Sequence, residues 1–138
     1  MLFNCITPDG YTVDANGCYV EPKSKFPEGT DLTSIDAREL TIDEMRQTLL
    51  ARINEERAKN GLQPLVTHRR INEVAQLRAN EITVLFEHTR PNGLAWHTAH
   101  DELRAGNGMI AENIARGYDN IDDVMDGWMH SEGHRENI

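Results

Sequence analysis

Residues 120–138 have the sequence NIDDVMDGWMHSEGHRENI, and the first half of this stretch carries a clear helical pattern. Its apolar side chains follow the i, i+3, i+4, i+7 spacing of an amphipathic helix, and they are Ile121, Val124, Met125 and Trp128. The helix is expected to start near Asn120, and Asp122 and Asp123 suit its positive N-terminal end. We expect this helix to pack on a core and to end at Gly133.

Working toward the N-terminus, the pattern predicts further helices. One begins at Thr41, which forms the capping-box pattern with Glu44, and ends at Asn60-Gly61. Another spans about 68–86 and buries a broad apolar face. A short helix is expected from a Thr98 cap to about Ala105, followed by a mostly extended stretch over 109–115.

The N-terminal part differs in composition. An Asn-Gly pair at 16–17 lies between two short β-prone runs, the typical signal of a tight hairpin. Residues 21–38 are charged and contain two prolines without periodicity, as a linker does. We therefore divide the chain into a hairpin segment (1–22), a linker (23–40) and a domain (41–138).

The composition sets limits on partners. The chain has 138 residues, of which 38% are hydrophobic, and 23 acidic against 14 basic residues give a formal net charge of -9. This balance argues against nucleic acid and anionic membranes as partners. No apolar run approaches the roughly 20 residues that cross a bilayer. The first residues lack the pattern of a signal peptide, so we expect any such peptide to have been removed.

The cysteines, Cys5 and Cys18, both lie near the N-terminus. Their spacing is not that of a paired metal motif. We expect one disulfide between them, and two thiols in a reducing compartment remain the alternative.

Several stretches, taken in order, resemble the bacterial branch of the CAP superfamily (cysteine-rich secretory, antigen 5 and pathogenesis-related proteins). The resemblance covers roughly residues 42–138. The stretches are INEER (53–57) with GL (61–62) and PL (64–65), Ala75 with RANE (78–81), FEHTRPNG (86–93), AENIA (111–115) and WMHSEGHRENI (128–138).

This resemblance implies an α+β fold, the three-layer α-β-α sandwich of the CAP type. Family domains continue for a few dozen residues beyond Asn137-Ile138 and supply strands of the central sheet. We therefore expect a mostly helical remnant with an N-terminal β-hairpin, in which the C-terminal strands are absent. A sheet lacking them has an exposed edge, so pairing into a homo-oligomer is a further expectation.

The resemblance also implies a cleft lined by two histidines and acidic residues. By motif match, His88 and His134 are the histidines and Glu112 is the first acid, while Ser131 stands where the family has its second acid. Ala111 and Ile53 also depart from the usual residues, which are glycine and, in animal and plant members, histidine.

Three functions remain open. The first is a secreted, extracellular or wall-associated, non-enzymatic domain whose cleft binds a small ligand, lipid, peptide or divalent cation. The second is a metal-dependent hydrolase that uses zinc or another divalent cation. Its ligands would be His88 and His134, with the Glu112 carboxylate completing the protein ligands or acting as general base. The third is a structural cell-wall-associated module, a spacer whose N-terminal hairpin (1–22) binds the wall.

Other residues favour structural interpretations. We expect the pairs His97/His100 and His130/His134 to be surface histidines, and Trp128 to belong to the core. Arg57 and Arg135 are expected to bond loop carbonyls or a carboxylate. Ser131 is expected to cap a helix or bond at its end, and not to act as a nucleophile.

Overall fold

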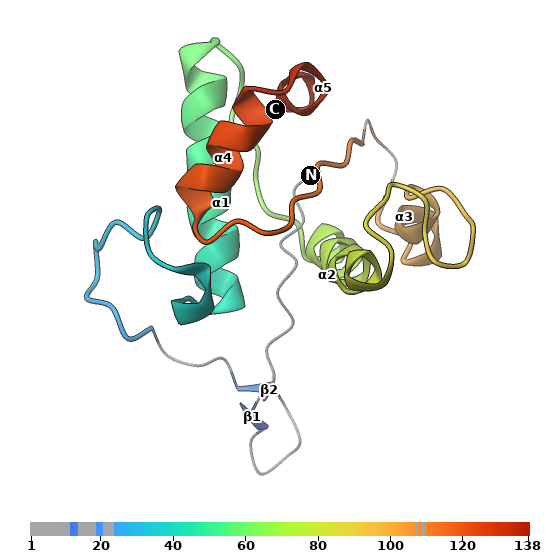
Figure 1. The fold of residues 1–138 in the computed structure, drawn as a ribbon, viewed down its shortest axis with the longest axis horizontal. Helices are drawn as coiled ribbons and strands as arrows, with labels where there is room; N and C mark the ends of the chain where they lie inside the picture. Colours follow the sequence, from blue (N-terminus) through green and yellow to red (C-terminus); the bar gives the residue numbers. More distant parts are fainter. Residues whose placement is uncertain (1–11, 14–18, 21–23, 107, 109) are drawn as a thin grey trace.

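A computed structural model describes residues 12–13, 19–20, 24–106, 108 and 110–138 of the chain. These residues are mostly helical (Figure 1). The elements in chain order are β1 (Thr12–Val13), β2 (Tyr19–Val20), the 3-10 helix η1 (Ala37–Glu39), α1 (Ile42–Lys59), α2 (Arg69–Val84), α3 (Thr98–Glu102), α4 (Ile121–Met129) and α5 (Glu132–Glu136).

The two strands pair antiparallel, with Thr12 opposite Val20 and Val13 opposite Tyr19. The Asn-Gly turn and both cysteines lie outside the described residues, so the hairpin and the disulfide stay predictions. Within the part of the chain that is described, the sheet contains only these strands, and Thr89 and Ala95 form an isolated bridge. The mostly helical character is confirmed, whereas the three-layer sandwich stays a prediction.

Helix α1 begins where the sequence predicts. The Thr41 side chain accepts the Glu44 backbone N–H at 3.1 Å, and the Glu44 carboxylate accepts the Thr41 N–H at 2.7 Å. This capping box satisfies donors that the first helical turn leaves without partners. The helix ends at Lys59 with Asn60 as its C-cap, also as predicted.

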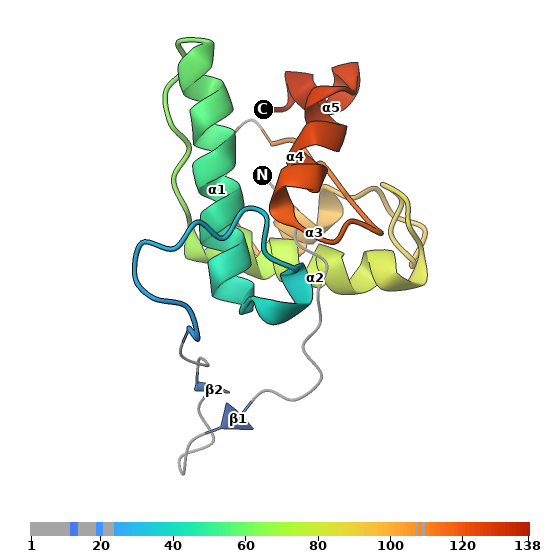
Figure 2. The same ribbon diagram turned by 60° about the vertical axis from the view of Figure 1, so that its left-hand side comes forward.

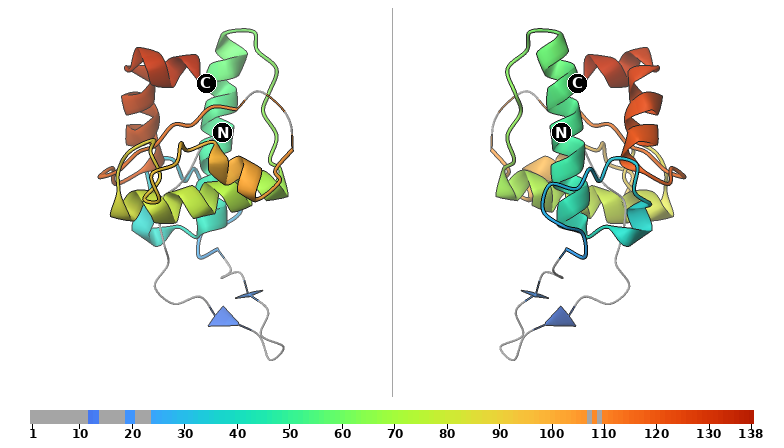
Figure 3. Two further views of the ribbon diagram at one scale, coloured as in Figure 1. Left: turned by 90° about the vertical axis from the view of Figure 1, so that its right-hand side faces the viewer. Right: turned by 90° about the vertical axis from the view of Figure 1, so that its left-hand side faces the viewer.

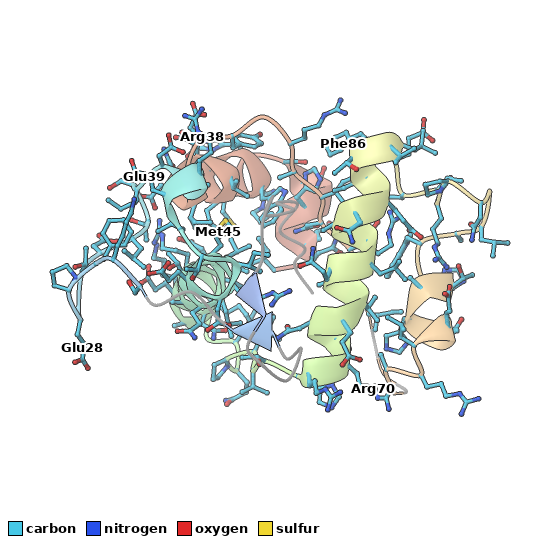
Figure 4. The ribbon with its side chains drawn as sticks, turned by 90° about the horizontal axis from the view of Figure 1, so that it is seen from below. Glu28, Arg38, Glu39, Met45, Arg70 and Phe86 are labelled. Carbon is cyan, nitrogen blue, oxygen red and sulfur yellow. The ribbon has the colours of Figure 1, made fainter. Side chains whose placement is uncertain are left out.

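The main core lies between α1 and α4, which contact each other; α4 lies in front of α1 in Figure 1 and next to it in Figure 2. Its fully or almost fully buried members are Leu40, Met45, Leu49, Ile53, Ile121, Met125, Trp128 and Ile138. Seen from below, Met45 lies between the two helices (Figure 4). Each large apolar side chain buried in this way contributes about 1.5–3 kcal/mol.

The segment expected to be a linker contributes to this core. Phe26, Leu32 and Ile35 pack against it, and the Asp122 N–H donates to the Thr33 carbonyl at 3.0 Å. The apolar residues of 24–40 are therefore partly buried on α1 and α4. The domain boundaries themselves stay a prediction.

A second, smaller core joins α2 to α3, with buried Val74, Ala75, Ala99 and Ala105. Helix α2 crosses the lower part of α1 (Figure 3). Helix α3 lies on the side of α2 that faces away from α1. Helix α2 ends at Val84, two residues earlier than predicted. Thr98 is the first residue of α3 and not its cap, because His97 occupies the cap position.

The C-terminal stretch also differs from expectation. Helix α4 starts at Ile121, next to the predicted start near Asn120, and Asn120 caps it, but the helix ends at Met129. Gly133 does not end it: this glycine lies inside the separate short helix α5, whose first turn follows Ser131. No helix among the described residues is long and apolar enough to cross a membrane.

Candidate functional site

His88 lies in the loop between α2 and α3, and its side chain is half exposed (53%). The loop closes on itself just beyond this residue, because the Arg90 N–H donates to the Leu94 carbonyl at 2.8 Å. Gly93 allows this turn with a φ of +82°. The backbone beside His88 is thereby fixed on one side.

The His88 ring contacts Glu112, whose side chain is fully buried. His88 Nδ1 lies 2.8 Å from Glu112 Oε1. The structure therefore places together two residues that lie 24 positions apart and that the sequence predicts to share a cleft. Their roles in binding stay a prediction.

Arg78, on the buried side of α2, holds the other side of this carboxylate. Its Nε donates to Glu112 Oε2 at 2.7 Å and its Nη2 donates to Glu112 Oε1 at 3.1 Å. Nη2 also donates to the Glu87 carbonyl at 3.0 Å, directly before His88. Arg78 has no exposed surface and thus orients both the carboxylate and the backbone that carries the imidazole.

The charge network continues from Arg78 to α3. Arg78 Nη1 donates to Glu81 at 2.7 Å, and Glu81 in turn accepts from Arg90 Nη2 at 2.7 Å. Arg90 Nη1 reaches Thr98 Oγ1 and Glu102 Oε2 of α3, each at 3.0 Å. The network therefore links α2, the His88 loop and α3.

Protonation follows from these contacts. Burial alone would lower the pKa of Arg78, but hydrogen bonds to Glu112 and Glu81 outweigh it and raise that pKa. Burial alone would raise the pKa of Glu81, but hydrogen bonds from Arg90 and Arg78 lower it below the usual range. Arg78 and Glu81 are therefore both ionised across ordinary pH.

Residues 112–114 connect this network to the C-terminal helices. The Asn113 side chain donates to the His134 carbonyl at 2.9 Å and accepts from Asn137 Nδ2 at 2.8 Å. The next carbonyl, of Ile114, accepts the Trp128 indole N–H at 3.2 Å. Consecutive residues of one segment thus hold the loop of His88 and the helix of His134.

The second predicted histidine has a different environment. The buried Nδ1 of His134 finds no hydrogen-bond partner in the described part of the chain, and its ring centroid lies 6.5 Å from that of Trp128. Ser131 occupies the N-cap position of α5, but its side chain makes no capping bond. Among the described residues, neither of these two side chains forms a hydrogen bond or ion pair with Glu112.

The contacts around Glu112 bear on whether a metal ion fits at this site. Nowhere in the residues that the structure describes do three His, Cys, Asp or Glu side chains gather as metal ligands. Glu112 already contacts Arg78 and His88 with its oxygens, so the carboxylate is occupied. This arrangement does not fit a zinc ion held jointly by His88, Glu112 and His134, which would need an open first shell.

The contacts also bear on the structural roles expected for a tryptophan, two arginines and a histidine. Trp128 is 2% exposed and belongs to the core, as expected. Arg57 bonds the Gln63 and Ile138 carbonyls, and Arg135 bonds the Met129 carbonyl, as expected. His100 is buried, so the prediction of a surface histidine was wrong there.

Two hollows lie away from His88. One of about 200 Å³ opens between α1, residues 65–68 and the start of α2, and another of about 300 Å³ opens between the end of α1 and α5. Neither of these two hollows is lined by His88, Glu112 or His134.

The positioning role of Arg78, Glu81 and Arg90 was missed in the sequence. One signal was present, because Arg78 interrupts the apolar stripe of α2 between Ala75 and Ala79. A charged residue on a buried helical face requires a partner, and the acid at i+3 was one candidate.

Comparisons with known proteins agree on the class. The half-exposed His88 contacts the buried Glu112 of the AENIA segment. This pairing agrees with the CAP pattern described above. The sequence profile of the CAP family, described as the cysteine-rich secretory protein family, matches residues 50–138. The chain belongs to this family.

The chain is similar to the uncharacterized protein YkwD of Bacillus subtilis (strain 168), with 31% identity over 98 residues. The match covers 62% of this chain and 34% of the relative, so the chain spans about a third of that protein's length. No solved structure matches the chain.

Proposed function

We propose that this chain is an extracellular, non-enzymatic binding domain of a bacterial surface, and that its ligand contacts the imidazole of His88. The observation that carries the proposal is the half-exposed ring whose Nδ1 lies 2.8 Å from a fully buried carboxylate. A carboxylate behind a histidine fixes the orientation of the ring and directs the other nitrogen outward. The family description, which refers to secretory proteins, supports the location.

Binding is favoured over hydrolysis because of where Glu112 points. A general base needs an oxygen within hydrogen-bond reach of the attacking water. Both oxygens of Glu112 are instead within 3.1 Å of Arg78 or His88 nitrogens, and the carboxylate is buried. The small ligand, lipid, peptide or cation classes expected from the sequence all remain compatible with an open imidazole nitrogen.

The test is co-sedimentation of the whole chain with purified cell walls of a Gram-positive bacterium. We expect His88→Ala to weaken binding roughly fivefold, the loss of about 1 kcal/mol for one hydrogen bond. His97→Ala is the matched control, since His97 is an exposed histidine of the same loop region, and it should bind like the wild type.

Three results would contradict the proposal. Equal binding by His88→Ala and wild type would remove His88 from the site. Loss of binding in Tyr19→Ala alone would favour the structural wall module carried by the N-terminal segment. Stoichiometric zinc together with chelator-sensitive hydrolysis would favour the hydrolase.

A further inference from the structure

The contact between His88 and Glu112 determines which ring nitrogen carries the proton. A carboxylate is only an acceptor, so an unprotonated Nδ1 at 2.8 Å from Oε1 would place two lone pairs against each other. The proton of the neutral ring therefore lies on Nδ1. The outward nitrogen, Nε2, then presents a lone pair.

The alternative is a protonated Glu112 that donates to His88, and the surrounding charges oppose it. Arg78 donates to both oxygens of Glu112, through Nε to Oε2 at 2.7 Å and through Nη2 to Oε1 at 3.1 Å. Neither side chain has any exposed surface. A neutral Glu112 would leave one side of this buried guanidinium without the carboxylate charge that it pairs with, which is unfavourable.

We infer that the ligand of this site is a hydrogen-bond donor, a hydroxyl or ammonium group that binds Nε2 of His88, and that carboxylates and phosphates are rejected. The inference rests on the proposed binding role of His88 and deepens it by naming the ligand class. Arg78 is the positioning residue, because it fixes the carboxylate that selects the tautomer. An acceptor ligand would meet an unprotonated nitrogen and gain no hydrogen bond.

The charge of the chain points the same way. A formal net charge of -9 repels anionic ligands and attracts cationic ones at low ionic strength. Local hydrogen bonding and the overall field thus select against the same class of ligand. Hydroxyl-rich and amino-bearing sugars combine the favoured groups.

The tautomer can be measured on the intact wild-type chain by long-range ¹⁵N–¹H NMR at about pH 8, above the usual titration range of histidine. We expect a pyrrole-type Nδ1 and a pyridine-type Nε2 for His88. His130 is the internal control, since its Nδ1 lies 2.8 Å from the Asp126 carbonyl and must also carry the proton. In Arg78→Lys, the Nε2–H fraction of His88 should rise while His130 stays unchanged.

The ligand class is tested with oligosaccharides of equal length made of glucosamine, N-acetylglucosamine or galacturonic acid. We expect the first two to shift the His88 Nε2 resonance and to bind at least roughly tenfold more tightly than the third. A proton on Nε2, tightest binding of the galacturonate probe, or no response of His88 to any probe would each overturn the inference. Failure of the proposed function appears separately, as cell-wall binding that does not depend on His88.

Discussion

Replacing Arg78 with methionine tests the buried network directly. The substitution keeps an unbranched side chain on α2 but removes the hydrogen bonds to Glu112, Glu81 and the Glu87 carbonyl. Glu112 is then a buried carboxylate left with only His88. Breaking a buried ion pair from one side costs about 3–5 kcal/mol, because the remaining charge loses its compensation.

The matched control is Arg69→Met on the same helix. Arg69 also pairs with a glutamate, at 2.9 Å from Glu73, but its side chain is 91% exposed. A surface pair of this kind contributes about 0–1 kcal/mol. The two variants therefore make the same chemical change with and without burial.

The assay is urea unfolding followed by circular dichroism at pH 7. Arg78→Met should lower the free energy of unfolding by about 3–5 kcal/mol, or the midpoint temperature by roughly 10–20 °C, and Arg69→Met by less than about 1 kcal/mol. If Arg78→Met does not fold, Arg78→Lys retains the charge and should be destabilised less. Equal, small losses for Arg78→Met and Arg69→Met would refute the claim of a buried network.

Further predictions concern the helices and the pH dependence. Thr41→Ala removes the capping box and should cost about 1 kcal/mol in urea unfolding, with Thr41→Ser near the wild type. Trp128→Phe leaves the Ile114 carbonyl without its donor and should cost about 1–3 kcal/mol, whereas Trp96→Phe, at a half-buried position, should cost less. Because the pKa of Glu81 is lowered in the fold, its stabilisation is complete above the ordinary glutamate value of about 4.3 and is lost as pH falls through the lower folded value. The unfolding free energy should therefore fall as the pH drops below the ordinary glutamate value, and a flat profile there would contradict this.

The helices were the part of the fold that could be predicted from local patterns. The Thr41–Glu44 box and the Asn120 cap are short-range hydrogen bonds that residue types nearly determine. The break between α4 and α5 was placed wrongly because Gly133 was taken as a stop signal. The helical turn instead ends at Met129 and a new one begins after Ser131.

The candidate site could be predicted only in part. The family pattern named His88 and Glu112, and the structure brings them into contact. The family pattern did not show that Arg78 contacts the other side of the Glu112 carboxylate, because that contact joins residues 34 positions apart. Without this contact, Glu112 was still a candidate for a general base or a metal ligand.

The central claim is that Glu112, fixed by Arg78, holds the His88 ring with Nε2 directed to the ligand. The most direct measurement is the long-range ¹⁵N–¹H spectrum of His88 in the unaltered chain, with His130 as the internal reference. We expect a proton on Nδ1 of neutral His88. A proton on Nε2 would show that Glu112 does not hold the ring in this way.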